Sequence, residues 1–391
     1  AANRAEVALR RASYFLGMGE FQSTIVSATR AAELAVAAGD AARQARAAVY
    51  HGNSLRYLGD FTGARDKLSE ALALARVASA KSVEMDALRS LGIVAQEQGD
   101  LAEQHFYFDG ALRLARETGD LWGERRALNS LGIIEQNKGD YGASQEYYQQ
   151  SLAIARNIGD RMGENTVLGN LGVQAYGLGQ YPEARAYLEE ALQIARDTND
   201  VVGVNTWLLN LAYIVAVLGE IDRALAYYDE ARVNVEEAGD RPLLGYVENG
   251  TGRVLLEGGR AAEAIPPLRQ ALALREEMEQ PHLAAESRLM LAEALAVTGS
   301  VVEALATLDE ALVFLQTDSL ETAEDTTRGL LAAYRVLSAA GDDRAAAVLE
   351  RAYSELQDAA ALFDEASRRA YLTNVPCNRE IVALREAMAR D

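Results

Sequence analysis

Residues 125–141 read RRALNSLGIIEQNKGDY, and a matching stretch begins 40 residues later, where residues 165–181 read NTVLGNLGVQAYGLGQY. Both stretches carry a Leu-Gly pair and end in a glycine turn followed, after one residue, by tyrosine. Their apolar residues fall three or four positions apart, which is the spacing of one buried stripe on an α-helix. The pattern therefore predicts one supersecondary unit that is copied along the chain.

A Gly-Asp dipeptide, or a close variant of it, marks the turns of this unit at steps of 20 residues. The ladder runs through Gly39, Gly59, Gly99, Gly119, Gly139, Gly159, Gly179, Asn199, Gly219, Gly239, Gly259 and Gly299. Glycine can end a helix in the left-handed conformation, and an aspartate after it can cap the next helix. We therefore expect two helices in each 40-residue unit.

A second set of small residues recurs in the middle of the first helix of each unit. Its members are Gly92, Gly132, Gly172, Ala212, Gly252 and Ala292. A glycine inside a helix costs up to about 1 kcal/mol relative to alanine. The recurrence predicts that the partner helix approaches too closely at these positions to leave room for a large side chain.

The composition of the 391 residues favours helices, because the chain has only 6 prolines and is rich in Ala, Leu, Glu and Arg. The formal net charge of −20 argues against a general nucleic-acid-binding surface and against an anionic membrane as a partner. No run of about 18 apolar residues and no signal peptide is visible in the sequence.

The single cysteine, Cys377, excludes a disulfide within the chain and favours a reducing, cytoplasmic compartment. The chain begins at Ala1 without a methionine, so we expect either a trimmed chain or a fragment of a longer protein. The acidic surface favours a monomer.

These motifs resemble the tetratricopeptide repeat (TPR) family, which is marked by Leu and Gly in the first helix, Gly-Asp-Tyr at the turn, and Ala in the second helix. The usual TPR unit has 34 residues, so the six extra residues here lengthen each helix by about three residues. The long form is similar to the kinesin-light-chain and LGN scaffold types and to the sensor arrays of bacterial STAND signalling ATPases. The resemblance implies an all-α, right-handed superhelical solenoid of antiparallel helix pairs.

We expect about nine repeats followed by capping helices. Residues 1–40 form a degenerate first repeat, residues 41–316 seven regular repeats, residues 317–357 a degenerate last repeat, and residues 358–391 the C-terminal capping helices. Pro266 and Pro267 fall inside a second helix, where they are expected to kink or shorten it because proline lacks the N–H donor. Pro281 is expected to replace a turn between two repeats.

No constellation for catalysis is visible. The histidines His51, His105 and His282 are far apart and lack a second ligand at helical spacing, so neither a metal nor another cofactor is expected. No nucleophile–base pair and no phosphate-binding glycine loop occurs, which predicts a non-enzyme.

The resemblance implies that the first helices line a concave groove, which binds a protein or peptide partner. Carried onto this chain, the groove residues are Arg46, Asn53, Arg56, Arg89, Gln96, Arg126, Asn129, Gln136, Tyr176, Asn170, Asn210 and Tyr213. Arginine and amide side chains suit carboxylates and an extended peptide backbone. An equal alternative is that the arginines pair with Asp86 and Glu97 inside the array. Similarly, asparagines such as Asn165 and Asn205 face the groove or bridge helices.

Two contexts for such a recognition module stay open. Residues 371–381, YLTNVPCNREI, resemble the tail of long TPR arrays that follow nucleotide-binding modules in STAND-type proteins, such as maltose-regulator-like transcription activators. The chain is then the bacterial sensor region that receives a protein, a peptide or a small-molecule inducer. In the alternative, it is a stand-alone scaffold or adaptor that binds partner peptides in its groove.

Overall fold

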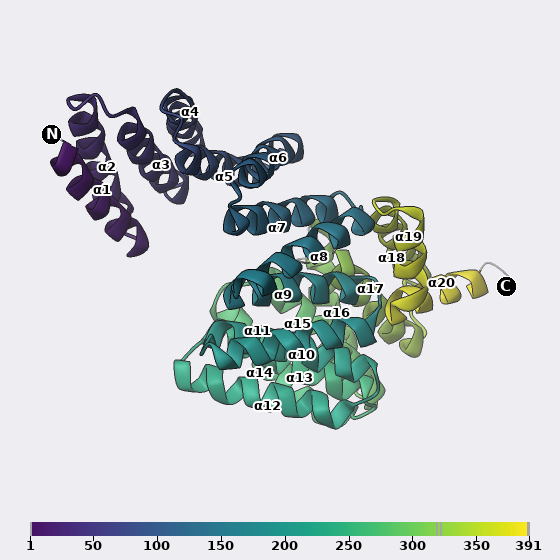
Figure 1. Cartoon of the computed structure of the whole chain (residues 1–391). Coiled ribbons are helices and arrows are strands. Elements are labelled where there is room, and N and C mark those ends of the chain that lie inside the picture. The colour runs from purple at the N-terminus through teal and green to yellow at the C-terminus, as the bar shows by residue number, and fades with distance from the viewer. Residues whose placement is uncertain (1, 318–319, 321–322, 389–391) are drawn as a thin grey trace. The chain divides into compact units, whose positions relative to one another are not determined.

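The computed structural model describes residues 2–317, 320 and 323–388, and within these residues the chain forms α-helices joined by short turns and no strand (Figure 1). The predicted all-α fold is therefore confirmed. The chain divides into two compact units, which we call the N-terminal unit (Ala1–Asn137 and Gly142–Gly163) and the C-terminal unit (Lys138–Tyr141 and Glu164–Asp391).

The helices of the N-terminal unit follow one another as hairpins. They are α1 (Ala2–Gly17), α2 (Phe21–Val36), α3 (Ala41–Tyr57), α4 (Phe61–Val77), α5 (Lys81–Glu97), α6 (Leu101–Thr118), α7 (Leu121–Asn137) and, except for its first residue, α8 (Tyr141–Ile158).

The C-terminal unit continues the same pattern and adds two shorter helices at its end. Its helices are α9 (Arg161–Gly177, from Glu164 on), α10 (Tyr181–Asp197), α11 (Val201–Val217), α12 (Ile221–Ala238), α13 (Arg241–Glu257), α14 (Ala261–Glu277), α15 (Pro281–Val297), α16 (Val301–Thr317), α17 (Ala323–Ala340), α18 (Ala345–Ala361), α19 (Glu365–Asn374) and α20 (Pro376–Met388).

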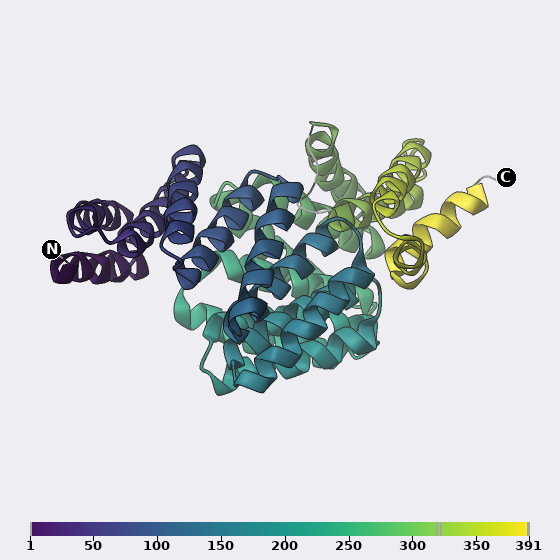
Figure 2. The same cartoon turned by 45° about the horizontal axis from the view of Figure 1, so that its top comes forward.

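Packing follows the order of the chain, as expected for a solenoid. Within each unit, helices that follow one another along the chain pack together, as α1 does on α2, α3 on α4 and α13 on α14. The odd-numbered helices also pack on one another, because α1 contacts α3, α3 contacts α5, and α11, α13, α15 and α17 form one continuous series. Figure 2 shows these paired helices from a second direction. A wall of odd-numbered helices therefore exists within each unit, made of α1, α3 and α5 in the N-terminal unit and of α11, α13, α15 and α17 in the C-terminal unit.

The turns have the predicted capping geometry. Asp200 accepts a hydrogen bond from the backbone N–H of Gly203 at 2.9 Å, and Asp100 does the same for Glu103. The preceding residue is left-handed at every rung of the ladder, including Asn199 with a φ of 54°. Aspartate therefore satisfies one exposed N–H at the helix start while its neighbour reverses the chain.

The close approach of paired helices is also confirmed. A Cβ built on Gly132 would lie 2.6 Å from the ring of Tyr148, and one on Gly172 would lie 2.5 Å from Leu188. Real Cβ atoms do not come so close to their neighbours. The second helix of each pair therefore packs its large side chain directly onto the glycine of the first.

The proline expectations require two corrections. Helix α14 runs without a break from Ala261 to Glu277 across Pro266 and Pro267, so the expected shortening is wrong. Pro281 does not replace a turn: it is the first residue of α15, and Glu279 takes the left-handed turn position with a φ of 56°. A proline fits the first turn of a helix because its missing N–H has no partner there in any case.

Candidate functional site

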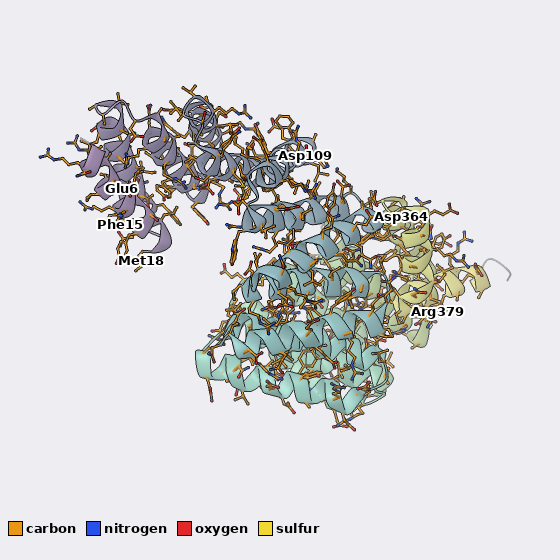
Figure 3. All side chains as sticks on the ribbon, in the orientation of Figure 1. Glu6, Phe15, Met18, Asp109, Asp364 and Arg379 are labelled. Carbon is orange, nitrogen blue, oxygen red and sulfur yellow. The ribbon has the colours of Figure 1, made fainter. Side chains whose placement is uncertain are left out.

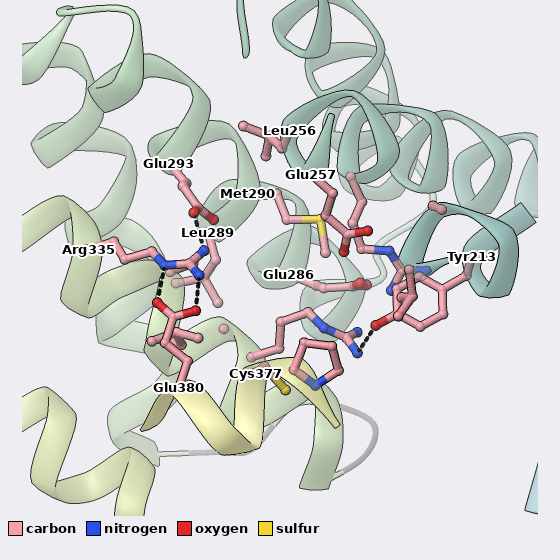
Figure 4. A pocket seen from close by; sticks show the side chains of 18 residues that line it. Tyr213, Leu256, Glu257, Glu286, Leu289, Met290, Glu293, Arg335, Cys377 and Glu380 are labelled. Atoms are coloured by element: carbon pink, nitrogen blue, oxygen red, sulfur yellow. Dashed lines mark hydrogen bonds and ion pairs between the residues drawn. The ribbon is translucent and has the colours of Figure 1, made fainter. Parts of the chain in front are cut away.

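A hollow in the C-terminal unit opens on the wall of odd-numbered helices (Figure 4). Helices α11, α13, α15 and α17 supply most of its lining, and α20 adds Pro376, Cys377 and Glu380. We call it the main cavity, and its volume is about 460 Å³. That volume falls within the range of roughly 300–1,000 Å³ that is usual for ligand pockets.

One end of the main cavity is formed by a tyrosine between two arginines. The guanidinium of Arg253 lies over the ring of Tyr213 at 4.0 Å from its centroid, and that of Arg328 lies at 5.2 Å. Arg328 also donates a hydrogen bond to the Tyr213 hydroxyl oxygen at 3.2 Å. These three residues come from α13, α11 and α17, so the wall of odd-numbered helices brings them together. We call them the arginine–tyrosine cluster.

Arg253 is held firmly at the back of this cluster. Its Nε is buried and has no hydrogen-bond partner, while the side chain also hydrogen-bonds to Tyr228 of α12. Burial raises the pKa of the Tyr228 hydroxyl, and the charge of Arg253 acts against that rise. Tyr228 is therefore a neutral support for the arginine.

The other end of the main cavity is acidic and already paired. Arg335 donates to Glu293 of α15 at 2.6 Å and to both carboxylate oxygens of Glu380 on α20, at 3.1 and 2.6 Å. Figure 4 shows this group on the opposite side of the hollow from Tyr213, with Leu289 and Met290 between the two ends. The cavity thus combines two polar ends with an apolar middle.

Two further glutamates face the main cavity. Glu286 accepts hydrogen bonds from Asn249 at 3.0 Å and from Arg275 at 3.2 Å. Burial raises the pKa of Glu257, although the charges of Arg253 and Arg328 partly offset the rise. Glu257 faces the arginine–tyrosine cluster. Among the described residues it makes no ion pair within 4.0 Å.

The last helices return to the first turns of the C-terminal unit. Asp364, at the start of α19 (Figure 3), donates its backbone N–H to the carbonyl oxygen of Gly139 at 3.4 Å. The ring of Phe363 meets Tyr141 edge-on at 5.2 Å. Asn374, at the end of α19, donates to the carbonyl oxygen of Leu178 at 3.3 Å. These contacts hold α19 across the turns that precede α8 and α10, and α20 follows directly as a wall of the main cavity.

A smaller hollow of about 270 Å³ adjoins the main cavity and shares Tyr213, Arg253 and Glu286 with it. It brings together three of the groove residues expected from the sequence, namely Tyr176, Asn210 and Tyr213. The rings of Tyr176 and Tyr213 meet edge-on at 5.2 Å.

In the N-terminal unit, three of the expected arginines line one hollow of about 220 Å³, namely Arg46, Arg89 and Arg126. Arg46 is not available as a free cation, because it pairs with Asp86 at 2.5 Å. Burial and the neighbouring Arg126 lower the pKa of Arg89.

Arg56 is also paired within the array, since it contacts Glu97 at 2.6 Å and lies over the ring of Tyr57 at 4.0 Å. The alternative of ion pairs inside the array therefore holds for Arg46 and Arg56. Arg89 and Arg126 have no such contact among the described residues.

The remaining expected groove residues do not line the hollows described above. Gln136 accepts a hydrogen bond from the Tyr148 hydroxyl at 3.1 Å, and Gln96 is exposed. The half-buried residues of this group are Asn53, Asn129 and Asn170.

The two other asparagines bridge helices. Asn165 accepts from the Trp207 indole N–H at 2.8 Å, and Asn205 accepts from Asn234 at 2.8 Å. Both side chains are buried, so they do not face a groove.

Arg253, Arg328 and Arg335 were not among the residues expected from the sequence. Arg253 follows Gly252 directly, as the expected groove residue Asn53 follows Gly52, so the repeat itself points to this position. Arg328 and Arg335 lie one residue away from Gly329 and Val336, which are the positions that a 40-residue step from α15 reaches. A strict 40-residue count therefore misses them. The turn glycine Gly341 lies 42 residues after Gly299, and the same step from Glu286 and Glu293 reaches Arg328 and Arg335, so the shifted turn is the sequence signal that would have found them.

Among the described residues, no group of three or more His, Cys, Asp or Glu side chains could hold a metal ion. The described helices include none with the length and apolar character that a bilayer crossing requires.

Comparison with protein families gives two matching models, and both describe the tetratricopeptide repeat. One matches residues 123–197 and 203–277, and the other matches residues 51–120 and 249–319. Together they span about two thirds of the chain. No curated protein matches the chain.

Several solved structures have a similar fold. A STAND protein with a tetratricopeptide repeat sensor from Pyrococcus horikoshii is 16% identical with a TM-score of 0.62, covering 80% of this chain and 52% of that one. The present chain thus spans about half of that protein. A Rap protein complexed with Competence and Sporulation Factor is 14% identical with a TM-score of 0.60, covering 92% of this chain and 99% of that one.

A second Rap protein, the conjugation gene regulator of plasmid pLS20 in complex with the Phr* peptide, is 13% identical with a TM-score of 0.53. The alignment covers 95% of the present chain and 97% of that one. At these identities the likeness shows a shared fold.

Proposed function

We propose that this chain, which belongs to the tetratricopeptide repeat family, binds a peptide in the main cavity and acts as the sensor region of a bacterial STAND-type signalling protein in the cytoplasm. The main cavity carries the proposal, because it is a hollow of ligand size with an apolar middle and charged ends. Neither matching family model describes an enzyme, which supports a recognition role.

A peptide is the partner that suits this site best. Its side chains reach apolar surfaces such as those of Leu289 and Met290, and its polar ends match the charged groups at either side. The Rap protein of similar fold that is complexed with the Phr* peptide supports the same choice. We propose that Tyr176, Asn210 and Tyr213 contact the bound peptide, and that Arg89 and Arg126 form a second contact region in the N-terminal unit.

The return of α19 supports the sensor role. Because Pro376, Cys377 and Glu380 of α20 line the cavity, a ligand there touches the last helix of the array as well as its wall. The contacts of α19 with Gly139 and Leu178 then link this ligand-contacting C-terminal end to the turns before α8 and α10. The division into nine repeats and capping helices and a monomeric state are further parts of the proposal, and a small-molecule inducer is the alternative ligand of the same sensor.

The second candidate is a stand-alone scaffold or adaptor that binds partner peptides in the same groove. The Rap protein complexed with Competence and Sporulation Factor favours the scaffold, because the alignment with the present chain extends over 99% of that protein's chain. The reading frame of the gene separates the two contexts. An adjoining domain with a Gly-x-x-x-x-Gly-Lys-Ser/Thr motif supports the sensor, and a frame that holds only the array supports the scaffold.

Peptide binding in the main cavity is tested through Cys377, the one cysteine of the chain, which lines the cavity. The immobilised chain is exposed to a random peptide pool, and the retained peptides are identified by mass spectrometry. The measurement is repeated after Cys377 has been alkylated with a bulky maleimide. We expect alkylation to abolish retention because the label fills the hollow.

The matched control carries Cys377→Ser and Val302→Cys, which moves the label to an exposed position on α16. This form is expected to retain peptides when labelled. Equal retention by both labelled forms, or no retention by the unlabelled chain, would show that the cavity does not bind peptides.

A further inference from the structure

We infer that the N-terminal unit binds a mononucleotide, with its phosphate on Arg89 and Arg126 and its base on the ring of Trp122. These three side chains line the hollow of about 220 Å³ described above, which we call the N-terminal hollow. It shares no lining residue with the main cavity. Nucleotide binding here therefore gives the second contact region a ligand of its own, beside the peptide proposed for the main cavity.

The N-terminal hollow forms where α5 approaches the first turn of α7. The sulfur of Met85 on α5 lies 2.5 Å from the place that a Cβ on Gly123 of α7 would occupy. Gly123 thus leaves room for α5. Phe108 and Ala111 of α6 and Ala127 of α7 add further apolar surface. The hollow therefore combines an apolar lining with its charged groups.

Two arginines in the N-terminal hollow lack a carboxylate. Among the described residues neither Arg89 nor Arg126 has an ion pair, whereas Arg46 in the same hollow is bound to Asp86. Burial and the neighbouring charge of Arg126 lower the pKa of Arg89. A phosphate monoester carries about 1.5–2 negative charges at neutral pH, so it offsets both guanidinium groups, whereas a carboxylate offsets one. The planar forks of arginine also match the oxygens of phosphate.

Trp122 supplies a stacking surface beside these arginines. It precedes Arg126 by four residues on α7, so the two side chains lie on the same face of the helix. Trp122 is 53% exposed although it lines the hollow. An exposed aromatic ring offers a π face on which a nucleobase stacks. Base and phosphate are joined by one sugar in a mononucleotide, and this length suits two sites about one helical turn, ~5.4 Å, apart.

The other polar groups of the N-terminal hollow already have partners. Asp86 and Ser82 accept hydrogen bonds from Arg46, at 2.5 and 3.1 Å. Asp120 accepts one from the backbone N–H of Gly123 at 2.9 Å. A peptide backbone needs a partner for each polar group that it buries. The hollow thus offers little to an extended peptide, whereas a mononucleotide uses the two arginines and the tryptophan.

The size of the N-terminal hollow and the charge of the chain restrict the ligand to a single nucleotide. A volume of about 220 Å³ lies below the roughly 300–1,000 Å³ of pockets that enclose a drug-sized ligand, so the sugar and the base edge stay in water. The net charge of −20 repels the many phosphates of a polynucleotide.

The test titrates the full chain with adenosine monophosphate and follows two signals. Calorimetry measures the affinity, and tryptophan fluorescence, excited where adenine does not absorb, reports on the base. The chain has two tryptophans, and the second, Trp207, donates a hydrogen bond to Asn165. We expect saturable binding with quenching of Trp122, because a stacked base quenches the indole ring. Absence of binding would overturn the inference.

Three related ligands test the parts of the site. Adenosine lacks the phosphate and ribose phosphate lacks the base, so each is expected to bind at least ~10-fold more weakly than adenosine monophosphate. Equal binding of adenosine would remove the arginines from the site, and equal binding of ribose phosphate would remove the tryptophan. N-acetyl-phosphotyrosine amide stands for a phosphorylated peptide, and its tighter binding would overturn the assignment to a nucleotide.

The arginines are tested with Arg89→Gln and Arg126→Gln, which are each expected to weaken adenosine monophosphate by ~10-fold or more and to leave adenosine unchanged. The control is Arg113→Gln, because Arg113 is already paired with Asp109. Circular dichroism checks that each variant is folded. Arg126 is exposed, so Arg126→Gln decides the question if Arg89→Gln does not fold. Unchanged affinity in folded Arg126→Gln would remove the arginine pair from the site.

The stacking surface is tested with Trp122→Leu, which is expected to abolish the quenching and to weaken adenosine monophosphate while ribose phosphate binds as before. The control is Phe106→Leu, which removes another exposed ring of the N-terminal unit. Equal affinity of adenosine monophosphate for both variants would show that no base stacks on Trp122.

Labelling of Cys377 separates nucleotide binding from the proposed function. Cys377 lines the main cavity and not the N-terminal hollow, so a bulky maleimide on it is expected to leave the nucleotide affinity unchanged. Loss of nucleotide binding on labelling would place the nucleotide in the main cavity and overturn the assignment. Peptide retention without nucleotide binding would overturn this inference alone, and nucleotide binding without peptide retention would overturn only the peptide proposal.

Discussion

Gly139 leaves room for the backbone of Leu362, because a Cβ built on Gly139 would lie 2.0 Å from the Leu362 carbonyl oxygen. Gly179 is similar, since its Cβ would lie 2.6 Å from Asn374. Other turn glycines, such as Gly119 and Gly219, have nothing within 4 Å. The glycines at these two turns therefore serve both the local turn and the docking of α19.

Gly139→Ala is expected to destabilise the C-terminal unit more than Gly219→Ala does. Both glycines have a similar positive φ, of 82° and 87°, so both variants share the cost of a left-handed alanine, which is about 1–2 kcal/mol. Only Gly139→Ala adds a clash with Leu362, worth about 1–3 kcal/mol. Urea denaturation measures the difference, and equal losses in the two variants would show that α19 does not dock on this turn.

Gly132→Leu is expected to destabilise the N-terminal unit by about 1–3 kcal/mol, because the new side chain overlaps the ring of Tyr148. The control is Gly177→Leu, at a helix end where a Cβ meets nothing within 4 Å. Thermal denaturation followed by circular dichroism compares the two. An unchanged melting temperature for Gly132→Leu would contradict the close approach of α7 and α8.

Glu257→Gln is expected to stabilise the chain at neutral pH. Burial raises the pKa of Glu257 above its usual 4.5, so the folded chain binds this proton more tightly than the unfolded chain. The contribution of Glu257 to stability is therefore complete below about pH 4.5 and is lost as the pH rises through the folded-state pKa. Urea denaturation of both proteins between about pH 4 and pH 8 measures it, and the advantage of the variant should shrink as the pH falls.

Glu263→Gln gives the opposite sign and serves as the control. Its hydrogen bond with Arg260 lowers the pKa of Glu263, so the wild-type residue stabilises the fold above its usual 4.5 and loses this effect in acid. A Glu257→Gln variant that is less stable than the wild type at pH 8 would mean that its neighbouring arginines outweigh burial.

Arg126→Gln is expected to stabilise the N-terminal unit by up to about 0.5 kcal/mol at low salt, since it removes a like charge beside Arg89. Salt screens the repulsion, so the gain should fall as the ionic strength rises. Arg113→Gln is the control, because Arg113 pairs with Asp109 at 3.1 Å and its loss removes an attraction. If Arg126→Gln lowered the melting temperature at low salt, repulsion from Arg126 would not add to the effect of burial on the pKa of Arg89.

The repeat pattern was sufficient to predict the local structure. The helix pairs, the left-handed turn residues, the aspartate caps and the tight glycine contacts all depend on residues at most about one unit apart. Such contacts repeat with the sequence, so their signals reinforce one another along the chain. Even Ser79, Asn199 and Glu279, which break the glycine ladder, adopt the positive φ that their place in the turn requires.

The groove residues were predicted less well than the helices and turns, because the pairing of each arginine depends on the side chains opposite it. The repeat offsets placed Arg46 and Arg89 on the same wall, but only the folded chain shows Arg46 bound to Asp86. It also brings Arg253 and Arg328, which the periodic count did not join, onto the ring of Tyr213.

The helical hairpin, its length and its turn chemistry can thus be read from the amino-acid pattern, because they follow from interactions between near neighbours. The place of the last helices becomes visible only in the folded chain. Asn374 meets Leu178 across 196 positions of the chain, and no periodic signal specifies a contact made once. The walls of the main cavity depend on this return, since α20, which supplies part of the lining, follows directly on the α19 that is docked on the earlier turns.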